Sequence, residues 1–358
     1  MTPDPGLASW FQLTLTPGLG PSVVRKLLKE YGLPQHVVAQ PRAALAAYAP
    51  PEALAALFSD EVAAAAAKSM EWAKRPGHHV VTLADESYPR SLLEISDPPT
   101  VLYAVGRLEL LGRQSLAVVG SRNSTAQGES NAESFSRALS EAGLTIVSGL
   151  ALGIDAAAHR GGLAGPGSTI AVLGTGIDVL YPKRNAELAA EIAKRGLLLS
   201  EFPLGTGALT YNFPRRNRLI SGLARGCLVI EAAAASGSLI TARTAAEQGR
   251  DVFAIPGSIH SPLSKGCHAL IKNGAKLVES ADDVLSELAG LRPSGSFGTA
   301  KATPHADTGL LAMSSPSLLR RPNSSLITQL AAILPSRPLA TASKNSALSR
   351  SATSTAAS

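Results

Sequence analysis

The sequence predicts an α/β protein built on a Rossmann-like, doubly wound and mostly parallel sheet, with a small N-terminal helical domain and a disordered C-terminal tail. Three observations predict this fold class. Helical patterns broken by prolines fill residues 1–76, aliphatic runs alternate with helical patterns through residues 77–290, and Ser, Ala, Thr and Pro dominate residues 291–358. The length of 358 residues suits about two domains of ordinary size.

The N-terminal domain is expected to consist of small helices rich in Ala and Leu. Its helices are divided by Pro17, Pro34, Pro41, Pro50 and Pro51. Residues 16–22, TPGLGPS, precede an apolar helical pattern and resemble a helix-hairpin-helix, in which a glycine turn offers backbone N–H groups to a phosphate. The alternative is an ordinary helix start with Ser22 as its cap.

The sheet domain is expected to begin with two short strands within residues 78–83 and 100–105. The aliphatic runs then predict strands at 116–119, 144–147, 169–173, 197–199, 228–230, 252–255 and 276–278. The segments between them predict helices at 127–142, 155–161, 186–194, 217–224, 239–249 and 267–273. Nearly continuous aliphatic strands are typical of a sheet that is covered on both faces.

The net charge of +6 arises entirely in the tail. Residues 291–358 hold seven basic residues and one acidic residue, so the preceding 290 residues balance at 26 against 26. The basic isoelectric point is therefore no evidence about the folded part. Any affinity for phosphate in the folded part must come from local clusters of basic side chains.

Several classes of protein are disfavoured by composition. No apolar run approaches the roughly 18 to 20 residues that span a bilayer, and the N-terminus lacks the basic and apolar regions of a signal peptide. We therefore expect a cytoplasmic protein that is not held in a membrane. Cys227 and Cys267 show no metal-ligand spacing and are expected to be reduced and structural, so no metal site is predicted.

The first candidate site follows the strand at residues 116–119. Gly120 allows close approach to an anion, Ser121 adds a hydroxyl donor, and Arg122 offers a planar guanidinium to a phosphate. Because the glycine pattern and the acidic residue of dinucleotide-binding proteins are missing, NAD binding is disfavoured and no cofactor is expected. The alternative is that Arg122 pairs with a surface carboxylate.

The second candidate site follows the next strand, where Ser148 and Gly149 end an apolar run. Asp155 stands at the start of the following helix and is available as its cap. His159 lies four residues later on the same helical face, so the two side chains could form an acid/base pair. Since no nucleophile with a recognisable turn accompanies them, a structural hydrogen bond is favoured.

Two further loops combine glycine with basic residues. Residues 174–178 contain two glycines, and Lys183 and Arg184 follow on the same loop, which suits a phosphate backbone. A solvated charge pair is the alternative. Ser236, Gly237 and Ser238 precede an apolar helix, where they could hold a phosphate or merely cap the helix.

The strongest signal is residues 213–218, FPRRNR. Arg215, Arg216 and Arg218 can neutralise phosphates, and Phe213 beside them offers a surface on which a base can stack. At least one of these arginines is expected to pair with Glu201 or Glu231 instead. Arg218 is the one expected to do so, since it lies inside the predicted helix.

Taken together, these residues resemble the DprA/Smf family, the DNA-processing proteins of bacterial natural transformation. The resemblance covers about residues 78–290. It rests on GSR at 120–122, SGLALGID at 148–155 with His159, AVLGTGIDVLYPKRN at 171–185, SEFPLG at 200–205, FPRRNRLISGL at 213–223, EAAAASGSLITA at 231–242 and IPG at 255–257.

The resemblance implies an extended Rossmann fold without established catalysis that binds single-stranded DNA in a basic pocket, dimerises and helps to load RecA. The residues implicated in DNA binding by the motifs or the resemblance are Gly120, Ser121, Arg122, Ser148, Gly149, Lys183, Phe213, Arg215, Arg216, Asn217, Arg218, Ser236, Gly237 and Ser238. Many similar proteins end in a winged-helix domain, for which residues 291–358 lack a plausible core. A helix at residues 266–273 could form the dimer face or cover the sheet.

Three hypotheses follow for the function. The first is a single-stranded DNA-binding recombination mediator, without enzymatic activity, that protects incoming DNA and helps to load RecA during transformation. The alternative is a nucleotide-processing hydrolase or transferase with Asp155 or Glu231 as acid/base, although the sequence contains no phosphate-binding P-loop motif. The third is a structural protein that binds RecA but not DNA.

Overall fold

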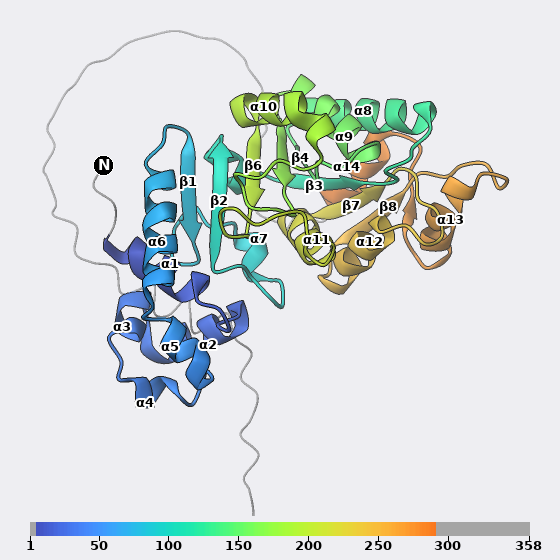
Figure 1. Ribbon diagram of the computed structural model, residues 1–358. Helices are drawn as coiled ribbons and strands as arrows, with labels where there is room; N and C mark the ends of the chain where they lie inside the picture. Colours follow the sequence, from blue (N-terminus) through green and yellow to red (C-terminus); the bar gives the residue numbers. More distant parts are fainter. Residues whose placement is uncertain (1–4, 291–358) are drawn as a thin grey trace, which may run out of the picture. The chain divides into compact units, whose positions relative to one another are not determined.

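The aliphatic runs form one nine-stranded sheet in the computed structural model, which describes residues 5–290 (Figure 1). The strands are β1 (His78–Thr82), β2 (Val101–Gly106), β3 (Ser115–Val119), β4 (Thr145–Ser148), β5 (Thr169–Val172), β6 (Leu197–Ser200), β7 (Gly226–Val229), β8 (Asp251–Ala254) and β9 (Lys276–Leu277). Every strand that the sequence predicts is present, with ends shifted by one or two residues. The predicted disordered tail at 291–358 lies outside the described residues.

The strand order is β1-β2-β6-β5-β4-β3-β7-β8-β9. Strand β1 pairs antiparallel with β2, and β2 pairs antiparallel with β6. All neighbours in the remaining order, β6-β5-β4-β3-β7-β8-β9, pair in parallel. The prediction of a doubly wound, mostly parallel sheet is therefore confirmed. The strand order reverses between β3 and β7, where sheets of this kind open a crevice at the carboxyl ends of their strands.

Helices cover both faces of the sheet (Figure 1). They are α1 (Pro5–Leu15), α2 (Pro21–Tyr31), α3 (Pro34–Val38), α4 (Arg42–Leu45), α5 (Pro51–Ala56), α6 (Asp60–Ala73), α7 (Arg90–Leu93), α8 (Ala126–Glu141), α9 (Ile154–Ala164), α10 (Ala186–Arg195), α11 (Asn212–Leu223), α12 (Ser238–Glu247), α13 (Lys265–Lys272) and α14 (Ala281–Gly290), with short 3-10 helices η1 (Leu108–Gly112), η2 (Lys183–Asn185) and η3 (Pro262–Ser264). Strand β3 shows the division. Leu116 and Val118 pack in a core with residues of α8 and α9, whereas Ala117 and Val119 pack in another with residues of α11 and α12.

Prolines begin several helices of the N-terminal part, and two of them, Pro34 and Pro51, are among the prolines predicted to divide these helices. Pro21, Pro34 and Pro51 each occupy the first turn of a helix, where the missing N–H group costs nothing. These helices share a core with the sheet, because the ring of Phe11 on α1 stacks at 5.8 Å on Tyr103 of β2. Within residues 5–290, no helix is both long enough and apolar enough to cross a bilayer.

Three helices differ from the prediction, and one of them is the short α7, which falls where no helix was predicted. Helix α11 begins at Asn212 rather than Asn217, because Pro214 falls in its first turn, where proline is tolerated and does not end the helix. Helix α14 was not predicted at all. Its signal is a capping arrangement in which the backbone N–H of Asp283 donates to the Ser280 hydroxyl and the N–H of Ser280 donates to the Asp283 carboxylate.

Candidate functional site

A cavity of about 680 Å³ lies at the carboxyl edge of the sheet, beside the place where the strand order reverses. Its lining comes from the loop after β3, the first turns of α11, and the segment that leads from β7 into α12. The predicted site residues that line it are Gly120, Ser121, Arg122, Phe213, Arg216, Asn217, Ser236, Gly237 and Ser238. Three parts of the chain that are far apart in sequence therefore meet as predicted.

Helical geometry divides the arginines of α11 between two sides. Because α11 already includes residues 212–216, Phe213 and Arg216 are one turn apart and lie on the side of the cavity. Arg215 and Arg218 are likewise three residues apart, and both reach the carboxylate of Glu201 on the other side. The arginines that the sequence presents as one cluster thus serve two different surroundings.

Arg122 lies beside two aromatic rings on the wall of the cavity. The guanidinium carbon of Arg122 lies 5.7 Å from the centre of the Phe213 ring, and the Tyr181 ring centre lies 5.5 Å from that of Phe213. Arg122 is exposed and forms no ion pair with any residue between 5 and 290, so its charge is available to a ligand. The alternative pairing of Arg122 with a surface carboxylate is absent there.

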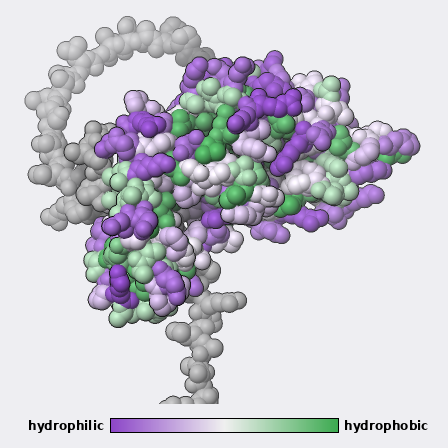
Figure 2. All heavy atoms as spheres, viewed as in Figure 1, coloured by the Kyte–Doolittle hydropathy of each residue, from purple (hydrophilic) through white to green (hydrophobic). Residues whose placement is uncertain are grey.

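Tyr181 was missed as a site residue, although its side chain is 48% exposed and it lines the cavity. The signal available in the sequence was an aromatic residue directly before the Pro-Lys-Arg segment. Figure 2 shows hydrophobic and hydrophilic residues interspersed over the visible face of the described residues. Exposed apolar and aromatic side chains beside a guanidinium suit a ligand that has both flat rings and negative charges.

Arg216 lies at the base of the cavity and is only 4% exposed. One of its Nη atoms donates to the carbonyl of Gly149 at 2.6 Å and also to the carbonyl of Val172. A Cβ atom at Gly149 would lie 2.6 Å from that nitrogen, so only glycine fits there. Burial lowers the pKa of Arg216 to about 10, against the attraction of the Asp155 carboxylate. Arg216 therefore remains charged at neutral pH and ties the loop after β4 to the end of β5.

Asp155 and His159 hold the loop after β4 through separate hydrogen bonds. One Asp155 oxygen accepts from the backbone N–H groups of Gly149 at 3.2 Å and Ala151 at 3.3 Å. The cap of α9 is Gly153, so the prediction that Asp155 caps this helix is wrong. Burial raises the pKa of the Asp155 carboxyl, although the charge of Arg216 opposes the change. This carboxylate is committed to the backbone, as the structural interpretation predicted.

The hydrogen-bond network assigns a neutral imidazole to His159. Its Nε2 accepts from the N–H of Leu150 at 3.2 Å, and its Nδ1 lies 2.7 Å from the hydroxyl of Thr169. That hydroxyl donates to a backbone carbonyl, so it accepts the proton of Nδ1. Burial, reinforced by the charge of Arg216, lowers the pKa of His159 to about 3.

The buried imidazole predicts a loss of stability in mild acid. Because the pKa of His159 is about 3 in the folded protein and about 6.5 in an unfolded chain, its contribution is complete above the unfolded value and falls as the pH falls. Between pH 7 and pH 5, the free energy of unfolding should drop by about 2 kcal/mol more in the natural protein than in His159→Gln. Urea unfolding at both pH values measures this difference.

The exposed His260 provides the matched control. His260→Gln should show the same pH dependence of unfolding as the natural protein. Equal pH dependence in the natural protein and His159→Gln would contradict the neutral, buried imidazole.

Glu231 occupies the start of α8, where dinucleotide-binding proteins hold a pyrophosphate. Its carboxylate accepts from the Thr125 hydroxyl at 2.6 Å and from the Thr125 N–H at 3.0 Å. A Cβ atom at Gly128 would lie 2.4 Å from the Glu231 carboxyl carbon, so this glycine makes room for the carboxylate. With a carboxylate already at that helix start, a dinucleotide phosphate would be repelled, and Glu231 is committed to the backbone of α8.

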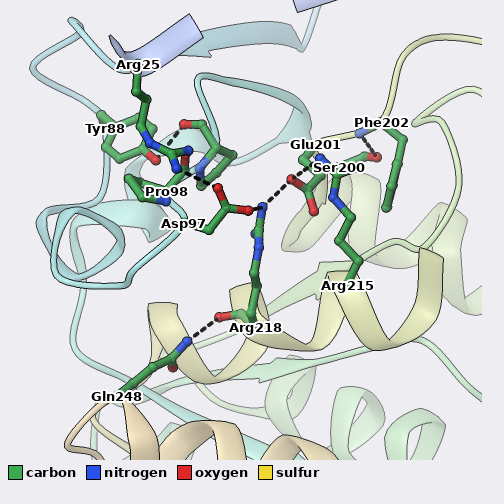
Figure 3. Close-up of polar contacts among 11 residues, drawn as sticks. Arg25, Tyr88, Asp97, Pro98, Ser200, Glu201, Phe202, Arg215, Arg218 and Gln248 are labelled. Carbon is green, nitrogen blue, oxygen red and sulfur yellow. Dashed lines mark hydrogen bonds and ion pairs between the residues drawn. The ribbon is translucent and has the colours of Figure 1, made fainter. Parts of the chain in front are cut away.

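Arg218 pairs with Glu201 at 2.6 Å, which confirms the predicted pairing (Figure 3). Arg215 lies 3.6 Å from the same carboxylate, and its guanidinium carbon lies 5.6 Å from the centre of the Phe202 ring. Arg215 is 43% exposed and lines a second cavity of about 370 Å³. That cavity is also lined by the turn at residues 18–21, which belongs to the predicted hairpin motif.

Three further predicted residues, Ser148, Gly149 and Lys183, lie outside the first cavity, whereas Ser236 and Ser238 line it. Ser148 is completely buried and donates to the Val118 carbonyl at 2.6 Å, and Gly149 is buried beneath Arg216. Lys183 is exposed on η2, close in sequence to Tyr181 but not in the lining. At the start of α12, the N–H of Ser238 donates to the Ser236 hydroxyl, so these residues form a local turn whose surface still faces the cavity.

His, Cys, Asp and Glu side chains are the potential metal ligands within residues 5–290. That part of the chain contains no group of three or more His, Cys, Asp or Glu side chains placed to hold a metal ion. Cys227 and Cys267 are both buried free thiols. Burial raises the pKa of Cys227 to about 12, so this thiol stays protonated at neutral pH.

A family model and two similar proteins point to the same family. The family model for DNA recombination-mediator protein A matches residues 79–289. The chain is 50% identical over 221 residues to Protein Smf of Escherichia coli, covering 62% of this chain and 59% of that protein. It is 52% identical over 219 residues to DNA processing protein DprA of Streptococcus pneumoniae, covering 61% of this chain and 76% of that protein. The match thus spans about three fifths of the length of the Escherichia coli relative.

Solved structures show the same relationship. The X-ray structure of DNA processing protein A from Streptococcus pneumoniae superposes with a TM-score of 0.69 at 44% identity, covering 78% of this chain and 97% of that chain. DNA processing protein A from Helicobacter pylori, described by its unique single-stranded DNA binding mode, superposes with a TM-score of 0.55 at 29% identity. That match covers 60% of this chain and 96% of the Helicobacter pylori chain.

Proposed function

Because the chain belongs to the DNA recombination-mediator protein A family, we propose that it binds single-stranded DNA in the cavity at the carboxyl edge of its sheet. The observation that carries the proposal is that Arg122 is exposed, forms no ion pair within residues 5–290 and lies beside the rings of Phe213 and Tyr181. Guanidinium and ammonium groups attract phosphates, and flat rings stack on bases of any sequence. Binding with little sequence preference follows from this combination.

Each part of the cavity would have a distinct role. Arg122 and Lys183 would neutralise phosphates from two loops of the sheet edge, because both side chains are exposed. Phe213 would stack on a base, and Tyr181 beside it would support a second base. The Ser236–Ser238 turn would let the backbone approach the DNA strand closely. A Cβ atom at Gly120 would lie 2.6 Å from the Ile154 side chain, so that glycine instead makes room for α9.

A catalytic role for this site is the weaker proposal. A hydrolase or transferase would need a free acid or base in the cavity, but Asp155 and Glu231 are both bound to backbone N–H groups. We therefore propose binding without chemical turnover.

The wider role that we propose is that of a recombination mediator in the cytoplasm. The protein would protect incoming single-stranded DNA and help to load RecA during transformation, acting as a homodimer. Leu270 and Ile271 of α13 pack against the core of the sheet. Of the two predicted roles of this helix, dimer face or cover for the sheet, these side chains therefore serve the cover. The dimer face is therefore better sought at neighbouring exposed side chains such as Leu277.

The salt dependence of DNA binding tests the proposed function. For about three to five neutralised phosphates, the logarithm of the affinity for oligo-dT should fall against the logarithm of salt concentration with a slope of roughly −2 to −3.5. Fluorescence anisotropy measures this slope. A blunt duplex of equal length is the comparison and should bind more weakly, since its bases cannot stack on the rings. Tighter binding to the duplex, or no binding to oligo-dT, would refute the proposal.

A further inference from the structure

Five charged residues of alternating sign connect α2 to the first turns of α11 (Figure 3). In spatial order they are Arg25, Asp97, Arg218, Glu201 and Arg215. Arg25 lies 2.7 Å from one Asp97 oxygen and also donates to the Pro98 carbonyl at 2.8 Å. The other Asp97 oxygen lies 3.3 Å from Arg218, whose same nitrogen lies 2.6 Å from Glu201. The N-terminal helices and the site helix are thus joined by a continuous series of ion pairs.

Three arginines share two carboxylates in this charge series, so one positive charge is in excess. Arg25 and Arg218 have side chains that are 13% exposed, whereas that of Arg215 is 43% exposed and lies farther from its carboxylate, at 3.6 Å. The excess charge is therefore carried by Arg215. Arg215 faces the second cavity and not the ring of Phe213, so its charge would meet a part of the DNA strand that extends beyond the first cavity.

The excess positive charge depends on Arg25, which is not one of the two proposed phosphate contacts, Arg122 and Lys183. Without Arg25, the carboxylate of Asp97 would keep only Arg218 among its described cationic partners. Arg218 could turn toward it, because its Nε and Nη1 atoms have no hydrogen-bond partner in residues 5–290. Glu201 is 3% exposed, and a buried carboxylate that loses its closest cation must recruit another. The available cation is Arg215.

We infer that Arg25 is a positioning residue of the DNA site, which neutralises Asp97 so that Arg218 stays paired with Glu201 and Arg215 remains available to phosphate. The N-terminal helices would thereby set how much positive charge the sheet domain offers to the DNA strand where it leaves the first cavity. This inference rests on the proposed function, because it concerns a phosphate contact of the same DNA strand.

Arg25→Gln tests the inference through the salt slope of oligo-dT binding in the full chain. The slope should become shallower by about 0.7, the value for one phosphate on a single strand, and the affinity should fall about five- to tenfold. Arg215→Gln should have the same effect. In the Arg215→Gln background, Arg25→Gln should change neither the slope nor the affinity further, because the charge that it controls is already gone.

Two controls separate this mechanism from simple loss of charge or fold. Lys26→Gln removes an exposed charge from the same helix and should leave the slope unchanged. Asp97→Asn leaves Glu201 paired with Arg218 and should preserve or raise the affinity, whereas damage to the fold would lower it. If Arg25→Gln does not fold, Arg25→Lys is compared with the natural protein in the same way. It should show a smaller change in the salt slope and in the affinity for oligo-dT.

The outcomes are distinguishable from failure of the proposed function. An unchanged slope in Arg25→Gln, with Arg122→Glu still abolishing binding, would overturn the inference alone. A further loss of affinity on adding Arg25→Gln to Arg215→Gln would also overturn it. Absence of oligo-dT binding by the natural protein would overturn the proposed function, and this inference with it.

Discussion

Arg122→Glu is expected to lower the affinity for single-stranded DNA by about 100-fold or more. The substitution removes a charge-assisted contact with phosphate, which is worth about 1.5 to 3 kcal/mol, and places a like charge beside the strand. It also removes the guanidinium that lies over the Phe213 ring. Because Arg122 is exposed and unpaired among the described residues, the fold should not depend on it. Anisotropy with labelled oligo-dT measures the loss.

The control must reverse an equally exposed charge elsewhere. Arg75 lies between α6 and β1 and is exposed, so Arg75→Glu changes the net charge by the same amount as Arg122→Glu. Its affinity should stay within about threefold of the natural protein at moderate salt, because charges farther away than about 10 Å are screened. Both variants should unfold at the temperature of the natural protein. Equal losses in the two variants would show that net charge, and not the cavity, drives binding.

The sheet could be predicted from the sequence because its signals are local. An aliphatic run such as Leu116–Val119 needs cover on both faces wherever it lies, and the turn after it must follow the strand end. The carboxyl ends of parallel strands meet at one edge, so the sequence also indicated that Arg122 and Phe213 would lie close together. These inferences require no knowledge of which distant residues pair.

The roles of individual arginines could not be predicted in this way. Once α11 is known to begin at Asn212, the helical period places Arg216 below the cavity and Arg218 against Glu201. A start at Asn217 would have left Arg215 and Arg216 on a loop. A difference of little more than one helical turn thus decides which guanidinium groups are free and which are structural.

Contacts between residues far apart in sequence could not be predicted either. Arg25 binds the Pro98 carbonyl across 73 positions, and nothing in the local pattern of α2 distinguishes it from the exposed Lys26 beside it. Tyr181 was missed for a similar reason, since its value depends on Phe213 lying opposite. Such contacts arise when complete helices and loops pack together. Local patterns in a single sequence do not show which residues of different elements will meet.

Arg216→Met is expected to act on stability, with a loss of about 3 to 5 kcal/mol in the free energy of unfolding. The substitution keeps much of the side-chain volume, but it leaves the carbonyls of Gly149 and Val172 without their donor. It also leaves Asp155, which is only 7% exposed, without its nearby positive charge. Urea unfolding measures the loss, and Leu223→Ala gives a comparison for the simple removal of buried volume on the same helix.

The double variant Asp155→Asn/Arg216→Met separates the charge effect from the lost hydrogen bonds. If an unpaired buried carboxylate causes much of the damage, the double variant should lose less stability than the sum of the two single variants. A DNA contact role for Arg216 makes the opposite prediction, namely a stable Arg216→Met protein whose affinity for oligo-dT is lost. Because Arg216 is almost completely buried and holds two backbone carbonyls, we expect the loss of stability, with any change in binding following from displacement of the Phe213 side of the cavity.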